Sequence, residues 1–239
     1  MIFTWASASN NGLVRSHNED SVAPRDMGIE MGSLVVGVAD GMGGAVGGEV
    51  ASSVALQAAL GAAGSAADRV RAANRAVVEA ADEDHTLRGM GTTLTLAVFS
   101  GDSVEVGHVG DSRAYLLRGG RLTQITTDHS LVAELVSRGE ISPDEADHHP
   151  YRSVITRALG LQDDVKIDEQ ALDLDSGDVV LVCSDGLSGM VPADQMSDLL
   201  LAEDHPTQVV WSLVDAANTA GGVDNISVVV VRVDDEATA

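Results

Sequence analysis

The sequence predicts an α+β fold in which two antiparallel sheets pack on each other and a helix pair covers each outer face, a four-layer α-β-β-α sandwich. Short β-branched runs bounded by turn residues come first and last, and Ala-rich helical stretches come in pairs between them. This order lacks the regular strand–helix alternation that builds a parallel sheet. No repeat or Pro-rich linker divides the chain, so we expect a single domain over residues 1–239.

The first predicted elements are a buried strand and two helices. The run SLVVGVAD at 33–40 is short, β-branched and bounded by turn residues, which is typical of a strand buried on both faces. Two Ala-rich stretches, 48–64 and 66–84, carry apolar residues at helical spacing. Three further segments alternate as antiparallel strands do, at 91–99, 103–120 and 121–130.

Further helices and strands are predicted in the second half of the chain. Residues 130–146 are predicted to be helical with a break before Pro143, because proline cannot continue a helix from within. Strands are expected at 165–174 and 178–186. The last predicted elements are two helices and a buried strand, at 192–204, 206–222 and 225–233. The tail DDEATA, residues 234–239, is expected to be frayed.

Composition limits the classes of partner. Asp and Glu total 37 against 14 Lys and Arg, which gives a net charge of −23 and excludes a basic surface for nucleic acid or anionic membrane. No run of eighteen apolar residues and no secretory leader is present. A single cysteine, Cys183, rules out an intramolecular disulfide. We therefore expect a cytoplasmic protein, and Met1 with the short acidic tail favours a complete, soluble chain. The sequence leaves the oligomeric state open, and we assume a monomer.

Four apolar runs each adjoin an aspartate. Asp40 ends VVGVAD, Asp111 follows VEVGHVG, Asp185 follows VVLVCS, and Asp224 precedes NISVVVV. The ends of neighbouring strands meet at one rim of a sheet, so these carboxylates are candidates for convergence. Glycines beside three of them, including Gly41, let the backbone approach a bound ion and leave its carbonyl free.

Clustered carboxylates indicate a cation site. Four of them packed together repel one another, and several would have to stay protonated without a cation. A ligand set made only of oxygen favours Mg(II) or Mn(II) over zinc. Two plainer interpretations stay open at this point, since Asp-Gly is a common turn dipeptide and most acidic residues only solvate a surface.

The N-terminal block NNGLVRSHNEDS places Arg15 shortly before Glu19 and Asp20. This spacing is compatible with a surface salt bridge. It is equally compatible with a guanidinium group that faces a phosphate beside a metal site. The residues alone do not decide between the two.

Eight short motifs stand between residues 5 and 233: NGLVRSHNEDS, VADGMGG, GTTLTLAV, VGDSRAYL, LTQITTDHS, HPYRSVITRALG, SDGL and DNISVVVV. In this order they resemble the motifs of the PPM family, the metal-dependent type 2C serine/threonine protein phosphatases. The resemblance covers nearly the whole chain. Met42, where eukaryotic members have a histidine that is a candidate general acid, is typical of bacterial members.

The resemblance implies a metal-binding role for each of the four aspartates that adjoin apolar runs. Asp40 would bridge two Mn(II) or Mg(II) ions, with the Gly41 carbonyl on the second ion. Asp185 and Asp224 would complete the first ion. Asp111 would hold a third, weaker ion together with Asp185.

The other motif residues would act on water and substrate. Glu19 and Asp20 would hold metal-bound water from the second layer of ligands, and Arg15 would bind the substrate phosphate. A metal-bridging water would attack phosphorus directly, without a phosphoenzyme. The implied substrates are phosphoserine and phosphothreonine in proteins, made by bacterial serine/threonine kinases. Hydrolysis of small phosphate esters is one alternative, and an inactive phosphoprotein-binding module is another; the complete aspartate set disfavours the latter.

Some positions depart from the family pattern or lie in its variable parts. Gly189 replaces an aspartate that often supports the third ion, so we expect that site to be weak. Residues 129–157 match the family's flap, a mobile lid beside the active site, in which Ser153 is placed to approach the third ion. His148 and His149 are read as ordinary loop histidines rather than metal ligands.

Three further features invite other interpretations. Cys183 lacks the arginine six residues later that a cysteine-based phosphatase needs, so we expect a core residue. The Gly-rich stretch 41–48 lacks the Lys-Ser/Thr of a nucleotide-binding loop. Trp5 and Trp211 are expected to be packing residues.

Overall fold

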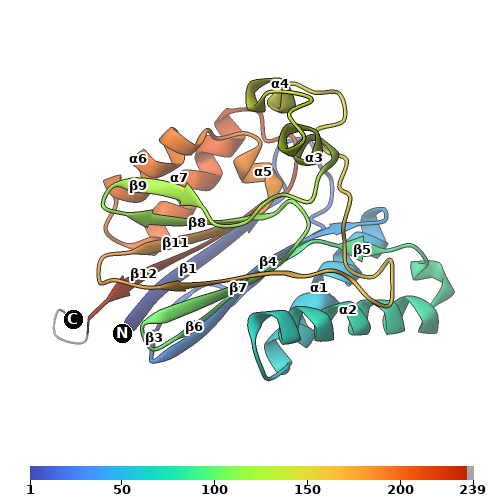
Figure 1. Cartoon of the computed structure of the whole chain (residues 1–239), viewed down its shortest axis with the longest axis horizontal. Coiled ribbons are helices and arrows are strands. Elements are labelled where there is room, and N and C mark those ends of the chain that lie inside the picture. Colours follow the sequence, from blue (N-terminus) through green and yellow to red (C-terminus); the bar gives the residue numbers. More distant parts are fainter. Residues whose placement is uncertain (236–239) are drawn as a thin grey trace.

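The two predicted antiparallel sheets are present and pack face to face (Figure 1). The computed structural model describes residues 1–235, apart from the side chain of Ala45. In spatial order, the first sheet contains β3 (Met27–Met31), β1 (Ile2–Asn10), β12 (Ile226–Asp234), β11 (Val179–Cys183), β8 (Arg113–Arg118) and β9 (Arg121–Gln124). The second contains β10 (Asp168–Asp173), β7 (Ser103–Val109), β6 (Leu94–Ser100), β4 (Ser33–Met42) and β2 (Asp20–Ala23), with β5 (Gly91–Thr92) beside β4.

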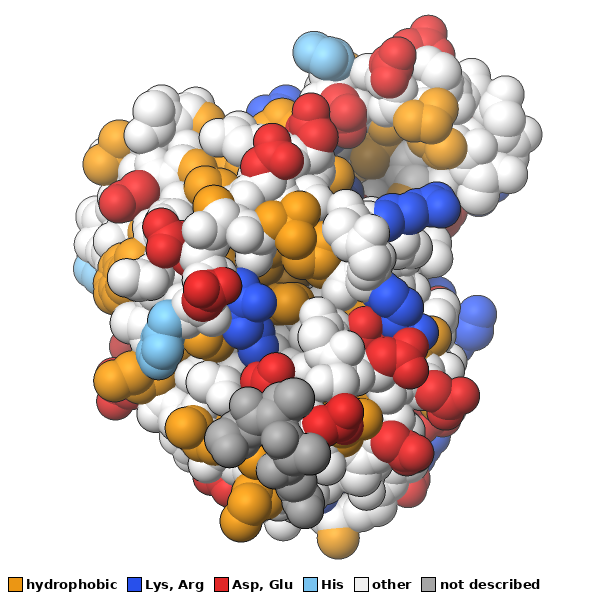
Figure 2. Space-filling view, turned by 90° about the vertical axis from the view of Figure 1, so that its left-hand side faces the viewer, with side chains coloured by type: hydrophobic (Ala, Val, Ile, Leu, Met, Phe, Trp, Pro, Cys, Tyr) orange, Lys and Arg blue, Asp and Glu red, His pale blue; other side chains and the backbone are white. Residues whose placement is uncertain are grey.

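A helix pair covers each outer face, as predicted. Helices α1 (Ala45–Gly61) and α2 (Ala66–Glu83) lie on the second sheet, and α6 (Ala193–Ala202) and α7 (Pro206–Thr219) lie on the first (Figure 1). The short elements are η1 (His85–Leu87), α3 (Leu131–Ser137), α4 (Pro143–Asp147) and α5 (Asp185–Ser188). Helices α3 and α4 stand at one end of the sandwich and project from it as a lobe (Figures 1 and 2).

The buried side chains form three layers. Between the sheets, the tilted rings of Phe3 and Phe99 have centroids 5.0 Å apart, and Val229 and Val231 of β12 belong to the same layer. The alternate residue Val230 points to the opposite face, against α6 and α7. This explains the unbroken valine run of β12, since a strand buried on both faces has no polar side. The third layer lies under α1 and α2.

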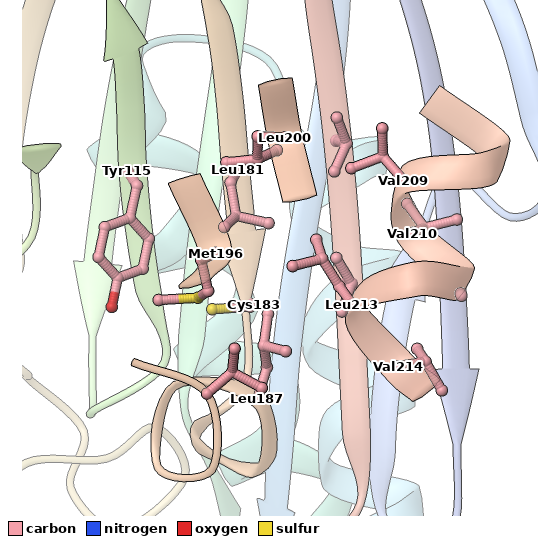
Figure 3. Close-up of a cluster of buried hydrophobic side chains, with 14 of the residues drawn as sticks. Tyr115, Leu181, Cys183, Leu187, Met196, Leu200, Val209, Val210, Leu213 and Val214 are labelled. Carbon is pink, nitrogen blue, oxygen red and sulfur yellow. The ribbon is translucent and has the colours of Figure 1, made fainter. Parts of the chain in front are cut away.

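Cys183 and Trp5 are core residues, as expected, whereas the prediction for Trp211 is wrong. Cys183 is fully buried among the side chains between the first sheet and α6 and α7 (Figure 3). Trp5 is also buried. Trp211 is 48% exposed because it lies on the solvent side of α7, opposite Val210 and Leu213.

Several element boundaries differ from prediction. Strands β1, β2 and β3 were not predicted, and their ladder partners supply the strand state. The predicted strand 178–186 ends at Cys183, and Asp185 begins α5. Asp234 is the last residue of β12, paired with Ile2, so the tail does not fray from 234. Residues 236–239, the rest of that prediction, lie outside the described residues.

Candidate metal centre

Asp40 and Asp20 face each other across two strands of the second sheet. Asp40 lies within β4 and is the direct partner of Asp20 at the start of β2. The predicted strand 33–40 therefore does not end at Asp40. Strand β4 continues through Gly41 and Met42 because these residues pair with β5. Like charges directly opposite each other destabilise an antiparallel strand pair, so the pairing of Asp20 with Asp40 is unfavourable for the sheet when both carboxylates are charged.

The backbone of Asp40 is fixed by the threonines of the motif GTTLTLAV. Its N–H donates to Thr93 Oγ1 at 2.9 Å, and its carbonyl accepts from Thr93 N at 2.8 Å and from Thr92 Oγ1 at 2.9 Å. Thr93 Oγ1 also lies 2.8 Å from Ser112 Oγ, next to Asp111. The Asp40 and Asp111 segments are thus joined through one threonine, whose role was not predicted.

Glycines beside Asp40 allow the chain to pack closely. A Cβ at Gly41 would overlap the Gly48 carbonyl and lie 2.6 Å from the Glu19 carbonyl. A Cβ at Gly48 would overlap the Glu19 carboxylate, so this carboxylate rests against the first turn of α1. Gly41 N donates to the Glu19 carbonyl at 3.2 Å. The glycines at 41 and 48 therefore let α1 and the Glu19 segment pack closely beside Asp40.

Asp185 and Asp224 lie at the same end of the first sheet. Asp185 follows β11 and Asp224 precedes β12, and these strands are antiparallel neighbours. Ser184 N donates to Ser227 O at 3.0 Å, which closes the ladder beside both aspartates. Asp111 lies in the connection between β7 of the second sheet and β8 of the first. The predicted rim therefore draws residues from both sheets.

Arg15 forms a salt bridge with Asp224 in this structure. Arg15 Nη2 lies 2.7 Å from Asp224 Oδ2, with 53% and 33% of the two side chains exposed. This hydrogen bond, followed by the charge of Asp224, raises the pKa of Arg15. One of the two interpretations of Arg15, a salt bridge, is thus present. Its partner is one of the predicted metal ligands, so the guanidinium lies at the rim.

Asn225 clamps the N-terminal loop to the start of β12. Its Oδ1 accepts from Glu19 N at 2.8 Å, and its Nδ2 donates to the carbonyls of His17 at 2.9 Å and Asn11 at 3.1 Å. Asn225 is buried. The sequence analysis assigned it no role, and its only sequence signal is an amide residue directly before a strand, next to Asp224.

Burial controls the protonation of the aspartates. Desolvation raises the pKa of Asp20 and of Asp111 to about 7. Desolvation also raises the pKa of Asp40 and Asp185, and neighbouring carboxylates add to the effect. For Asp40 these neighbours are Asp20, Asp185, Asp111 and Asp224, in that order of effect. The aspartates therefore act on one another as one electrostatic cluster.

Among residues 1–235, three buried carboxylate oxygens have no hydrogen-bond partner: both oxygens of Asp20 and Oδ1 of Asp185. A buried polar atom without a partner is costly, so each such atom in a folded protein calls for an explanation. Within residues 1–235, no group of three or more His, Cys, Asp and Glu side chains could hold a metal ion as the side chains stand. The oxygen donors nonetheless fit a hard cation in chemistry, with Arg15 as the neighbouring positive charge.

The segment 129–157 is tied at its base to the Asp111 connection. Gly110 N donates to His129 Nδ1 at 3.0 Å, and His129 N donates to Gly110 O at 2.7 Å. His129 Nε2 lies 2.8 Å from Arg157 Nη1 and 3.3 Å from Asp168 Oδ2. Arg157 is in turn paired with Asp168 at 2.8 Å. This His129–Arg157–Asp168 anchor joins both ends of the segment and was not predicted.

Ser153 lies in an exposed turn of the same segment, and its proposed approach to a third ion stays a prediction. His148 and His149 are engaged locally: His148 Nδ1 lies 3.0 Å from Asp144 O, and His149 Nδ1 accepts from Tyr151 N at 3.2 Å. The exposed Gly189 donates its N–H to the Asp185 carbonyl at 2.7 Å, so this position supports the backbone of Asp185 rather than offering a carboxylate.

A sandwich of two antiparallel sheets with a shared rim of buried aspartates defines a class of α+β protein with a candidate cation site. Residues 13–218 match the family model described as "Protein phosphatase 2C". The chain belongs to the protein phosphatase 2C family. This match confirms the resemblance drawn from the sequence.

Relatives and solved structures agree with this assignment. The chain is 40% identical over 163 residues to the serine/threonine phosphatase stp of Listeria welshimeri, and the match spans 68% of this chain and 65% of that protein. It is similar to the crystal structure of the Mycobacterium tuberculosis serine/threonine phosphatase PstP/Ppp, with a TM-score of 0.89, 38% identity, and coverage of 98% and 100% of the two chains. The catalytic domain of PstP in complex with two manganese ions gives a TM-score of 0.86 at 37% identity, covering 98% and 99%.

Proposed function

We propose that this protein is a metal-dependent protein serine/threonine phosphatase that hydrolyses phosphoserine and phosphothreonine. The observation that carries the proposal is the set of buried aspartate oxygens without partners at the rim shared by both sheets, next to Arg15. Oxygen donors of this kind fit Mn(II) or Mg(II). The related PstP catalytic domain holds two manganese ions, which supports two such ions here.

The residues would divide among the ions as follows. Asp40, Asp185 and Asp224 would hold the first ion, and Asp40 with the Gly41 carbonyl would hold the second. A weaker third ion would lie at Asp111 and Asp185, with Ser153 nearby. When bound, the ions would supply positive charge and lower the pKa of the water they bind toward neutrality.

The chain's own groups would position water and substrate. The carboxylates of Glu19 and Asp20 accept hydrogen bonds, so they would orient water at the rim. Arg15 would present its guanidinium fork to the phosphate oxygens and stabilise the charge that they gain in the transition state. Its present bond to Asp224 holds the guanidinium at this position. Met42 has no titratable group and cannot supply the proton for the leaving seryl or threonyl oxygen, and we propose that water supplies it.

The proposal extends to substrates and location. The substrates are phosphorylated proteins, the products of bacterial serine/threonine kinases, and the protein acts as a cytoplasmic monomer. Within the described chain no helix is long and apolar enough to cross a membrane. Asp and Glu outnumber Lys and Arg by 37 to 14, and acidic side chains are scattered over the face shown in Figure 2, so bound cations would supply much of the positive charge that a phosphate needs.

The test is hydrolysis of a phosphothreonine peptide with manganese, with a chelator, and by Asp185→Asn. We expect activity that requires manganese and falls at least 100-fold in the variant, because the amide cannot replace a carboxylate that holds two ions. Asn218→Ala, a change outside the rim, is the control and should retain activity. Hydrolysis that persists in chelator, or that Asp185→Asn leaves intact, would contradict the proposal.

A further inference from the structure

Three large apolar side chains stand in solvent beside Arg15 and Asp224. Leu13 is 70% exposed, Val14 68% and Val223 47%. Single exposed apolar residues are ordinary on protein surfaces. These three differ because they lie within two residues of Arg15 or Asp224, which form a salt bridge at the rim of the candidate site.

The two loops that carry them run side by side. Leu13 N donates to Gly222 O at 2.7 Å, and two residues further along each loop Arg15 pairs with Asp224, also at 2.7 Å. Gly12 has φ +74°, and a Cβ there would lie 2.6 Å from the Gly222 carbonyl, so only glycine permits this approach. A Cβ on Gly222 would lie 3.0 Å from Leu13 Cγ, which places the Leu13 side chain over the second loop.

The loops are held in place before any ligand binds. Asn225 donates from Nδ2 to the carbonyls of Asn11 and His17, on either side of Leu13 and Val14. A ligand that covers these side chains therefore loses little conformational entropy in ordering the loops, which favours binding. We name the exposed surface of Leu13, Val14 and Val223 the apolar platform.

We propose that the apolar platform binds an apolar side chain of the substrate polypeptide within three residues of the phosphorylated serine or threonine. This inference rests on the proposed function. Leu13 and Val14 are one or two residues from Arg15, and an extended chain advances about 3.3–3.6 Å per residue, so a peptide whose phosphate lies at Arg15 reaches the platform with a near neighbour.

The negative charge of the protein also favours an apolar residue beside the phosphorylated serine or threonine of the substrate. The chain carries −23 overall, which repels acidic flanking residues. The platform itself is uncharged, and the adjoining cation Arg15 is occupied by Asp224 and the phosphate. Leucine, isoleucine, valine or methionine near the phosphoresidue gains from burial against the platform. The proposed substrates are thus phosphoproteins whose sites have large aliphatic neighbours.

The test compares two phosphothreonine peptides that differ only in carrying leucine or serine at the positions within three residues of the phosphothreonine. With manganese, the unaltered protein should hydrolyse the leucine peptide with a kcat/KM about tenfold higher, because partial burial of leucine against the platform is favourable and burial of serine is not. In Leu13→Ser/Val14→Ser the ratio should fall to about one, through a higher KM for the leucine peptide. Ile29→Ser/Met31→Ser removes two equally exposed apolar residues from edge strand β3 and should preserve the ratio.

The outcomes separate the two proposals. No hydrolysis of either peptide contradicts the proposed function and removes the basis of the platform. Equal hydrolysis of both peptides by the unaltered protein leaves the phosphatase proposal intact and overturns the platform. The platform is also overturned if Leu13→Ser/Val14→Ser slows both peptides equally. A dimer seen by sedimentation and lost in that variant would mean that a second copy covers these side chains, which likewise overturns the inference.

Discussion

Replacing Asn225 with alanine should destabilise the protein through the N-terminal loop. The change removes three hydrogen bonds from one buried side chain, to Glu19 N, His17 O and Asn11 O. His17 and Asn11 are exposed residues, so water replaces the lost donor there at about 0.5 kcal/mol each. Glu19 is a half-buried residue whose N–H loses its acceptor, which costs about 1–2 kcal/mol.

The sum is about 2–3 kcal/mol in the free energy of unfolding. For a chain of this size each kcal/mol lowers Tm by about 2–4 °C, so Asn225→Ala should melt roughly 4–12 °C below the unaltered protein. The measurement is thermal unfolding by circular dichroism with chelator present, so that bound metal does not contribute. The manganese-dependent kcat/KM should also fall, because the loop carries Arg15 and Glu19.

Asn218→Ala is the matched control for this change. Asn218 is half-buried, makes one long hydrogen bond of 3.5 Å to Asn10, and has a buried Oδ1 without a partner. Its truncation removes an unsatisfied atom, so Tm should change by less than about 2 °C. If the two variants melted together, or if Asn225→Ala melted with the unaltered protein, the clamp would have no energetic role.

Three further predictions follow from the rim and the core. Gly41→Ala should lose at least tenfold in manganese-dependent kcat/KM because its Cβ overlaps the chain around Glu19, whereas Gly61→Ala, with open space at its Cβ, should be neutral or slightly more stable in a thermal melt. In chelator, the free energy of unfolding should decrease as the pH rises from about 4 to about 7. Over this range Asp20, whose pKa is raised to about 7, keeps a proton in the folded state that the unfolded chain has released. Urea titrations should show a smaller decrease in Asp20→Asn, and an unchanged pH profile would contradict the shift. Burial raises the pKa of Cys183 to about 12, so it should react with a thiol reagent at pH 8 only in denaturant; rapid reaction of the native protein would show that the strand opens.

The layers of the fold could be predicted because each buried strand carries its own signal. The valine run of β12 and the run in β4 are apolar on both faces, and the helix pairs show helical spacing. Strand β2 has four residues and β3 contains an exposed Met-Gly-Ile-Glu-Met run, so neither has a strong local preference. Their strand state comes from pairing with β4 and β1, which no local pattern reports.

The sequence predicted that aspartates meet at one end of a sheet, but it did not predict the hydrogen bonds that hold these segments in place. Aspartates that adjoin apolar runs indicate a rim, and Asp185 and Asp224 do lie at one end of the first sheet. The bonds that hold the rim join residues far apart in sequence, such as Thr93 with Asp40 and Asn225 with Glu19. These are side-chain to backbone bonds with no periodic pattern, so only the tertiary structure reveals them.

The position of the rim predicts that metal binding is coupled to the packing of the two sheets. Asp20 and Asp40 belong to the second sheet, Asp185 and Asp224 adjoin the first, and Asp111 lies in the connection between them. An ion held by Asp40 and Asp185 would therefore join the sheets, while the same carboxylates repel one another when no cation is present. Because only the packed sheets assemble these ligands, manganese should raise Tm by an amount that grows with ion concentration. The stabilisation should be largely lost in Asp185→Asn, and a melt of the unaltered protein that is insensitive to manganese would refute this coupling.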